Sequence, residues 1–185
     1  MIRGRKRKAG ARYPSGKLTR AETEREAMAT AIDARRRHFG INAKAARDER
    51  LGCALGRLAF KRVISEAQYQ AGLHFAELHS RHAKALGLPQ PTPQSLSALL
   101  IGESIFGSLS GELSIEIING LKRRYGEATK ALDECDREQR LSQGRRPTWL
   151  IYHLICLDED LDEKMGEDIG NLRVALNALV RVFRL

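Results

Sequence analysis

The longest helical pattern in the chain is residues 114–141, which read SIEIINGLKRRYGEATKALDECDREQRL. Apolar side chains recur here alternately three and four residues apart, at Ile118, Leu121, Tyr125, Ala128, Leu132 and Cys135. This spacing predicts a helix whose apolar stripe packs against another helix. The repeat is too short for a free-standing coiled coil, so we expect packing within the same chain. Self-association as a homo-oligomer through 114–141 is the alternative.

The segments on either side also carry helical signals. Residues 65–68, Ser-Glu-Ala-Gln, form a capping box, and Gly87 marks the end of the helix that follows. Thr19 and Glu22 suggest a second capping box, opening a helix that ends at Gly40. Further helices are predicted at 43–63, at 96–106, at 149–157 and over the last residues up to Phe183.

Composition agrees with these patterns. Apolar residues make up 42% of the 185 positions and aromatic residues only 5%, with Ala and Leu dominant. This balance favours helix over sheet. We therefore predict an all-α protein, a multi-helix bundle or bundles with a disordered basic N-terminal arm.

A proline-rich stretch, LPQPTPQ at 88–94, predicts a stiff connector between two halves. The predicted organisation is a disordered cationic arm at 1–19, a three-helix region at 20–87, a linker at 88–95 and a helical region at 96–185.

Positive charge is concentrated at the N-terminus. The first 20 residues, MIRGRKRKAGARYPSGKLTR, hold eight cations and no acid, while the whole chain carries +9, which leaves +1 for the other 165 residues. Such an arm is typical of contact with a nucleic-acid backbone, because each neutralised phosphate releases condensed counterions. The predicted contacts in the arm are Arg3, Arg5, Lys6, Arg7, Lys8, Arg12, Lys17 and Arg20. A second cluster, Arg35, Arg36 and Arg37, either helps them or forms a solvated helix face.

The acidic stretch after residue 157 resembles a calcium loop only in part. Asp158, Asp160 and Asp162 alternate, but Glu163 stands where the loop needs Gly and Ile169 where it needs Glu. We expect a solvated loop and helix start; the alternative is that these acids hold the cationic arm when no DNA is bound.

Residues 149–183 could also form a helix-turn-helix. Its recognition helix would expose polar side chains to base edges, namely Asp168, Asn171, Arg173, Asn177, Arg181 and Arg184. The neighbouring acids carry the wrong charge for phosphates, so base reading by this segment is the less favoured interpretation.

No pattern indicates a catalyst, cofactor or metal. The chain lacks GxxxxGK[ST], GxGxxG and GxSxG motifs, and His74, His79 and His82 share one predicted helix without further ligands. Cys53, Cys135 and Cys156 are widely separated and resemble small apolar residues of a reducing cytoplasm. No apolar run approaches the ~20 residues of a membrane span. We therefore expect a cytoplasmic, non-enzymatic protein.

Residues 3–21, RGRKRKAGARYPSGKLTRA, resemble the opening of short, uncharacterised proteins from alphaproteobacterial phages and prophages, which begin GRxRK and continue to SGRLSRA. Gly56-Arg57-Leu58 and residues 64–72, ISEAQYQAG, are similar to a helix pair of the same proteins. The resemblance implies a phage setting, in which small basic helical proteins serve DNA packaging or late-gene control.

These observations predict non-enzymatic DNA binding through the basic arm, with RNA as the alternative nucleic acid. Two other functions remain open. One is an oligomeric packaging subunit similar to a small terminase subunit; the other is an adaptor that binds a host or phage protein, such as the host transcription machinery.

Overall fold

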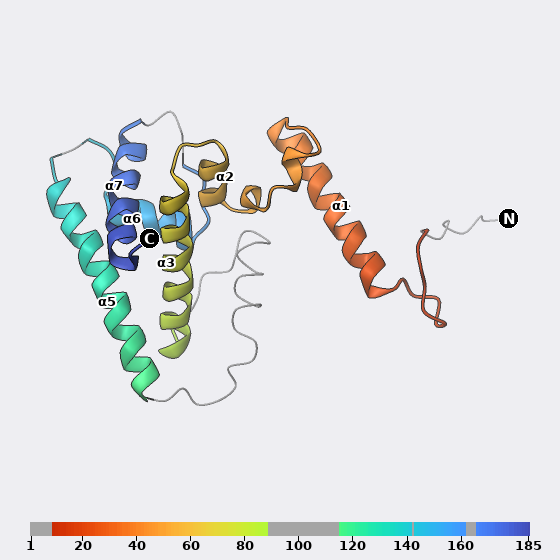
Figure 1. Cartoon of the computed structure of the whole chain (residues 1–185), viewed down its shortest axis with the longest axis horizontal. Coiled ribbons are helices and arrows are strands. Elements are labelled where there is room, and N and C mark those ends of the chain that lie inside the picture. The colour runs from red at the N-terminus through yellow and green to blue at the C-terminus, as the bar shows by residue number, and fades with distance from the viewer. Residues whose placement is uncertain (1–8, 89–114, 142, 162–165) are drawn as a thin grey trace. The chain divides into compact units, whose positions relative to one another are not determined.

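The computed structural model describes residues 9–88, 115–141, 143–161 and 166–185. The chain divides into two compact units, unit 1 at Met1–Asp48 and unit 2 at Glu49–Leu185. Within the described ranges the regular elements are helical, and the one extended pairing is an isolated bridge between Arg12 and Leu18 (Figure 1). The predicted all-α class is confirmed.

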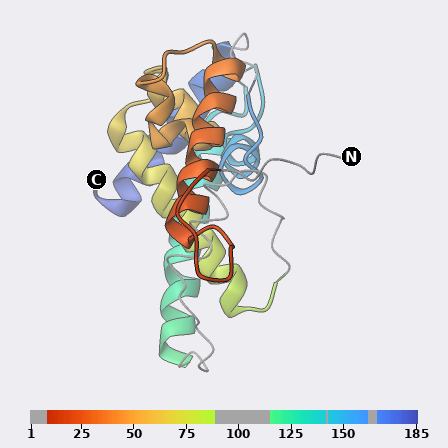
Figure 2. The ribbon, with the colours of Figure 1, turned by 90° about the vertical axis from the view of Figure 1, so that its right-hand side faces the viewer.

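Unit 1 is built on one long helix, α1 (Arg20–Phe39), which Figure 2 shows as an uninterrupted ribbon. It ends as predicted at Gly40, whose φ of +62° is the left-handed conformation that glycine adopts without strain. The predicted capping box at its start is wrong, because the Thr19 side chain makes no capping hydrogen bond. Beyond α1 the chain forms a short 3₁₀ turn, η1 (Ala45–Arg47).

Residues 11–19, within the predicted arm, form a turn that two backbone hydrogen bonds close. The Tyr13 amide donates to the Lys17 carbonyl at 2.9 Å, and the Thr19 amide donates to the Ala11 carbonyl at 2.9 Å. Pro14 and Gly16, the latter with φ +81°, suit the tight reversal between them. Residues 1–8 lie outside the described residues.

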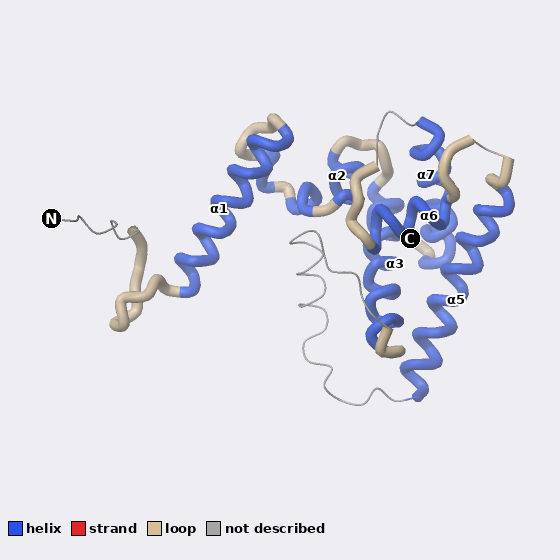
Figure 3. The backbone as a smooth tube through the Cα atoms, turned by 180° about the vertical axis from the view of Figure 1, so that it is seen from behind, coloured by secondary structure: helices blue, strands red, loops and turns tan. Residues whose placement is uncertain are grey.

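Unit 2 is a helical bundle centred on α7 (Gly166–Phe183), which contacts α3 (Glu66–Ala85), α5 (Ile115–Glu138) and α6 (Pro147–Ile151) (Figures 1 and 3). The central position of α7 follows from its sequence, because its apolar side chains recur with helical spacing. Four of them are completely buried: Leu172, Ala175, Leu176 and Leu179.

The α3 helix forms as predicted. The Ser65 hydroxyl accepts from the Gln68 amide at 3.2 Å while the Gln68 side chain accepts from the Ser65 amide at 2.8 Å, which completes the capping box. Gly87, with φ +64°, allows the Leu88 amide to reach back to the Ala83 carbonyl at 2.9 Å.

The apolar stripe predicted within 114–141 faces α3 and α7 of the same chain. Leu121, Ala128, Leu132 and Cys135 are buried there. The expected packing within the chain is therefore observed. Self-association through α5 would have to use another of its faces or open these contacts.

The single helix predicted at 43–63 is wrong. The chain instead forms η1, a second 3₁₀ turn, η2 (Glu49–Gly52), and the short helix α2 (Ala54–Phe60). Arg62, at φ +58°, ends α2 by turning the chain back, so that the Val63 amide donates to the Leu58 carbonyl. The apolar spacing of this region therefore reflects burial in short turns rather than one continuous helix.

The predicted domain boundary also needs correction. The structure divides after Asp48, and α3 contacts α5 and α7 of the same unit instead of completing an N-terminal three-helix region. The predicted linker at 88–95 and helix at 96–106 lie outside the described residues, except Leu88.

The apolar segment 149–157 begins as α6 and continues as a π-helical turn, η3 (Tyr152–Cys156). Leu150, Ile151 and Leu154 are buried, as expected for the core. Trp149 and Tyr152 of the same segment remain 38% and 42% exposed.

Candidate nucleic-acid interface

The net charge of the chain resides entirely in unit 1. Residues 1–48 contain 14 Lys and Arg against 5 Asp and Glu, a net charge of +9. Residues 49–185 contain 18 of each sign and are neutral. A polyanion in solution is therefore attracted to unit 1, and unit 2 adds no net attraction.

Unit 1 has almost no hydrophobic core. Among its described residues Ala46 is the one buried apolar side chain, while Met28 in the middle of α1 is 61% exposed. The helix is held by local interactions, such as ion pairs from Arg25 to Glu22 at 3.8 Å and from Arg36 to Asp33 at 3.4 Å. A helix that is polar on most of its surface is available for contacts with a partner.

The predicted arm contacts fall into two groups. Arg3, Arg5, Lys6, Arg7 and Lys8 lie outside the described residues. Arg12 and Lys17 lie exposed on the turn of residues 11–19, where Arg12 also donates to the Gly16 carbonyl at 2.7 Å. Arg20 is the first residue of α1, but its side chain is not among those described.

The second predicted cluster separates into different roles. Arg35 is half-buried and donates to the carbonyls of Ala46 at 3.4 Å and Asp48 at 3.3 Å, so it fixes η1 against α1. Arg36 and Arg37 are exposed on the last turn of α1, where cations also interact favourably with the helix dipole. Within the cluster these two side chains are therefore the ones presented to a ligand.

Two of the six side chains that a helix-turn-helix would present to base edges are buried in α7. Asp168 is 2% exposed and accepts from the Arg145 amide at 2.7 Å, and Asn171 is 5% exposed and donates to the Arg145 carbonyl at 2.9 Å. Asn177 accepts from the Gln68 side chain at 2.8 Å. Asp168 and Asn171 are therefore not available to read base edges. The other four candidates are exposed: Arg173, Asn177, Arg181 and Arg184.

The acidic side chains of residues 158–160 make contacts within unit 2 that the sequence did not predict. Asp158 accepts from the Ala54 amide at 2.7 Å and so caps the start of α2 across 104 positions of sequence. Asp160 accepts from Arg57 at 2.8 Å, and Glu159 lies 2.7 Å from the His153 ring nitrogen. Each of these three acids has a partner within unit 2, while Asp160 remains exposed to solvent, as expected of a solvated loop. Asp162 lies outside the described residues.

Two of the three α3 histidines belong to an aromatic cluster with Tyr125 of α5. The His79 Nδ1 atom lies 3.1 Å from the Tyr125 hydroxyl, and the His82 ring stacks on Tyr125 with a centroid distance of 4.1 Å. Burial, and then the neighbouring charge of His82, lowers the pKa of His79; burial, and then Lys122, lowers the pKa of His82. Both rings are therefore biased towards the neutral form that the cluster accommodates.

The described part of the chain shows neither a reactive environment at the Cys156 thiol nor a cluster of metal ligands. Burial raises the pKa of the Cys156 thiol to about 12, so this sulfur is protonated at neutral pH. Within the described ranges no group of three or more His, Cys, Asp and Glu side chains is arranged to hold a metal ion.

Comparison with known proteins adds no assignment: no family model, curated protein or solved structure matches the chain. Among the described helices none has the length and apolar character needed to cross a bilayer.

Proposed function

We propose that this protein is a non-enzymatic DNA-binding protein that contacts the phosphate backbone through unit 1. The observation that carries the proposal is that the unit with the net positive charge is also the unit with almost no buried core. The whole net charge of +9 belongs to a unit in which, among the described residues, a single apolar side chain is buried. A segment of this kind gains stability mainly from a partner, and the partner that its charge favours is a polyanion.

The proposed interface has two parts. The first is the arm with Arg3, Arg5, Lys6, Arg7, Lys8 and Arg12, together with Lys17 and Arg20 at its end. The second is the exposed pair Arg36 and Arg37 on the last turn of α1. A phage or prophage setting, with a role in DNA packaging or gene control, follows from the resemblance of residues 3–21 and belongs to the same proposal.

The test is the affinity for duplex DNA as a function of salt concentration. In a plot of the logarithm of the binding constant against the logarithm of the salt concentration, each neutralised phosphate contributes about −0.9 to the slope. The eight arm cations therefore account for a slope of at most about −7. Replacing the six arm cations from Arg3 to Arg12 by Gln should make the slope less steep by about 5. The double variant R36Q/R37Q should make the slope less steep by about 2.

A matched control neutralises cations of unit 2. The variant K130Q/R137Q/R140Q removes three charges from α5 and the residues after it, and its slope should equal that of the natural protein. Equal losses from the arm variant and the control would contradict the proposal. The same titration with duplex RNA distinguishes the two nucleic acids.

A further inference from the structure

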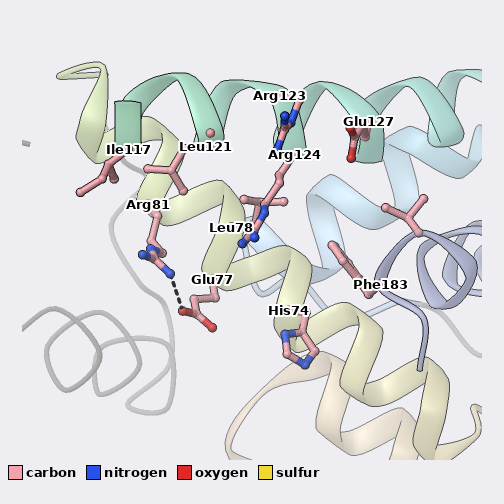
Figure 4. Close-up of a pocket in the computed structure, with 12 residues that line it drawn as sticks. His74, Glu77, Leu78, Arg81, Ile117, Leu121, Arg123, Arg124, Glu127 and Phe183 are labelled. Carbon is pink, nitrogen blue, oxygen red and sulfur yellow. Dashed lines mark hydrogen bonds and ion pairs between the residues drawn. The ribbon is translucent and has the colours of Figure 1, made fainter. Parts of the chain in front are cut away.

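Unit 2 carries a groove between α3 and α5, to which the last turn of α7 contributes Val182 and Phe183 (Figure 4). The groove has a volume of about 530 Å³. None of the sequence motifs pointed to it, because its walls come from three segments that are distant in the chain.

The floor of the groove is apolar. Leu78 of α3 and Leu121 of α5 close it from below with 9% and 8% of their surface exposed. Ile117 remains 48% exposed at one end, and Phe183 is half-buried at the other. The accessible apolar surface is therefore mainly that of Ile117 and Phe183 at the two ends of the groove. Apolar surface that is rimmed by charged side chains is typical of a protein-binding site.

The rim is mainly cationic. Arg123 and Arg124 extend from α5, and Arg81 extends from α3 on the opposite wall (Figure 4). Two acids also line the groove; Glu77 lies 3.4 Å from Arg81 in an ion pair, while Glu127 stands further along α5. The two adjacent arginines therefore leave a positive excess at the α5 wall.

The dimensions fit a short helix. The lining residues of α5 run from Ile117 to Glu127, and at 1.5 Å per residue this wall is about 15 Å long. Two to three helical turns cover that distance. A nucleic-acid strand fits less well, because the Leu78 and Leu121 side chains on the floor offer no hydrogen bonds to bases or phosphates.

We propose that this groove binds a short amphipathic helix of a partner protein, with apolar side chains on the floor and Asp or Glu side chains against Arg123 and Arg124. Anchors at positions i, i+3 or i+4 and i+7 of the partner helix would follow the floor, as in other helix-in-groove complexes. The proposal does not depend on DNA binding by unit 1. The protein would then bind DNA through one unit and a second protein through the other.

The test uses the full chain and two labelled helical peptides. Both peptides carry Leu at i, i+3 and i+7; one has Glu at the flanking positions and the other has Lys there. The natural protein should bind the Glu peptide more tightly. The variant R123E/R124E should weaken that binding by about tenfold or more and bind the Lys peptide better, since interfacial charge pairs of this kind have coupling energies above 1.4 kcal/mol.

The control is R137E/R140E, which changes the same number of charges outside the groove and should leave both affinities unchanged. The fluorescence of Trp149, the only tryptophan, reports whether each variant is folded; if R123E/R124E unfolds, R123Q/R124Q takes its place with a weaker expected effect. Equal affinity for the two peptides, binding of neither, or unchanged affinity in the groove variant would overturn the proposal. Binding of single-stranded oligothymidylate that R123E/R124E abolishes would overturn it in favour of a nucleic-acid groove.

Discussion

The helices α1 and α7 are similar in length and opposite in what stabilises them. α1 has 20 residues, nine of them charged, and none of its described side chains is buried. α7 has 18 residues, four of them charged, and buries seven. Local capping and ion pairs account for the first helix, whereas tertiary packing accounts for the second.

This difference extends from the two helices to the two units, which differ in net charge and in buried core. Among the described residues of unit 1, one apolar side chain is buried and most Lys and Arg side chains are exposed. In unit 2 the charges balance, and several of them, such as Asp158 and Asp168, hold the fold. The contrast implies that changes to the buried core of unit 2 alter the stability of the protein more than changes to the exposed side chains of unit 1 do.

The largest effect is expected from opening the core of unit 2. The Leu176 side chain is completely buried in α7, so Leu176→Ala should lower the free energy of unfolding by about 3 kcal/mol through lost burial and a cavity. Urea denaturation followed by Trp149 fluorescence measures this loss. The matched change in α1, Met28→Ala, should alter stability by less than about 0.5 kcal/mol; comparable losses from both would show that α1 has a packing partner.

The next effect concerns the closest backbone approach in unit 2. A Cβ atom at position 56 would overlap the Arg50 carbonyl, so Gly56→Ala should destabilise unit 2 by about 2 kcal/mol. Gly126 on α5 has open space at the same position, and Gly126→Ala should stabilise the protein by about 0.5 kcal/mol. Urea midpoints of the two variants should move in opposite directions, and shifts of the same sign would refute this account.

Helix capping compares the two units directly. Ser65→Ala removes a capping hydrogen bond of 3.2 Å from α3 and should cost about 1 kcal/mol. Thr19→Ala should cost less, because the Thr19 side chain makes no capping bond to α1. Thermal unfolding monitored by circular dichroism measures both, and the reverse order would contradict the observed caps.

The smallest effect is a pH dependence confined to unit 2. The pKa values of His79 and His82 are lowered from 6.5, mainly by burial, so the unfolded chain binds more protons than the folded protein as the pH falls below about 6.5. The urea midpoint should therefore decrease with acidification. The variant H79Q/H82Q should reduce that decrease, and an unchanged decrease in this variant would contradict the account.

Local features of the fold were predictable from the residues nearby. The capping box at Ser65, the glycine stops at Gly40 and Gly87 and the apolar stripe of α5 each depend on positions within a few turns of one another. The apolar spacing at 43–63 suggested one helix, but these residues form the three short elements η1, η2 and α2. The acceptor for the Ala54 amide at the start of α2 is Asp158, which lies far along the chain.

The candidate interface divides in the same way. Charge segregation is a property of composition, so the cationic arm and the arginines of α1 could be found without coordinates. The separate role of Arg35, whose guanidinium holds η1, could not, because it depends on carbonyls more than ten residues away. The groove at Arg123 and Arg124 was also hidden, since its floor joins α3, α5 and α7.

The sequence alone determined the helical class, the best-capped helix and the location of the positive charge, because periodicity, caps and net charge are set by neighbouring residues. The tertiary structure decided that the chain divides after Asp48, that α7 forms the centre of the bundle and that Asp168 and Asn171 are buried. These features depend on which helices pack together. That choice is made by the total apolar surface buried between distant segments, which no local pattern specifies.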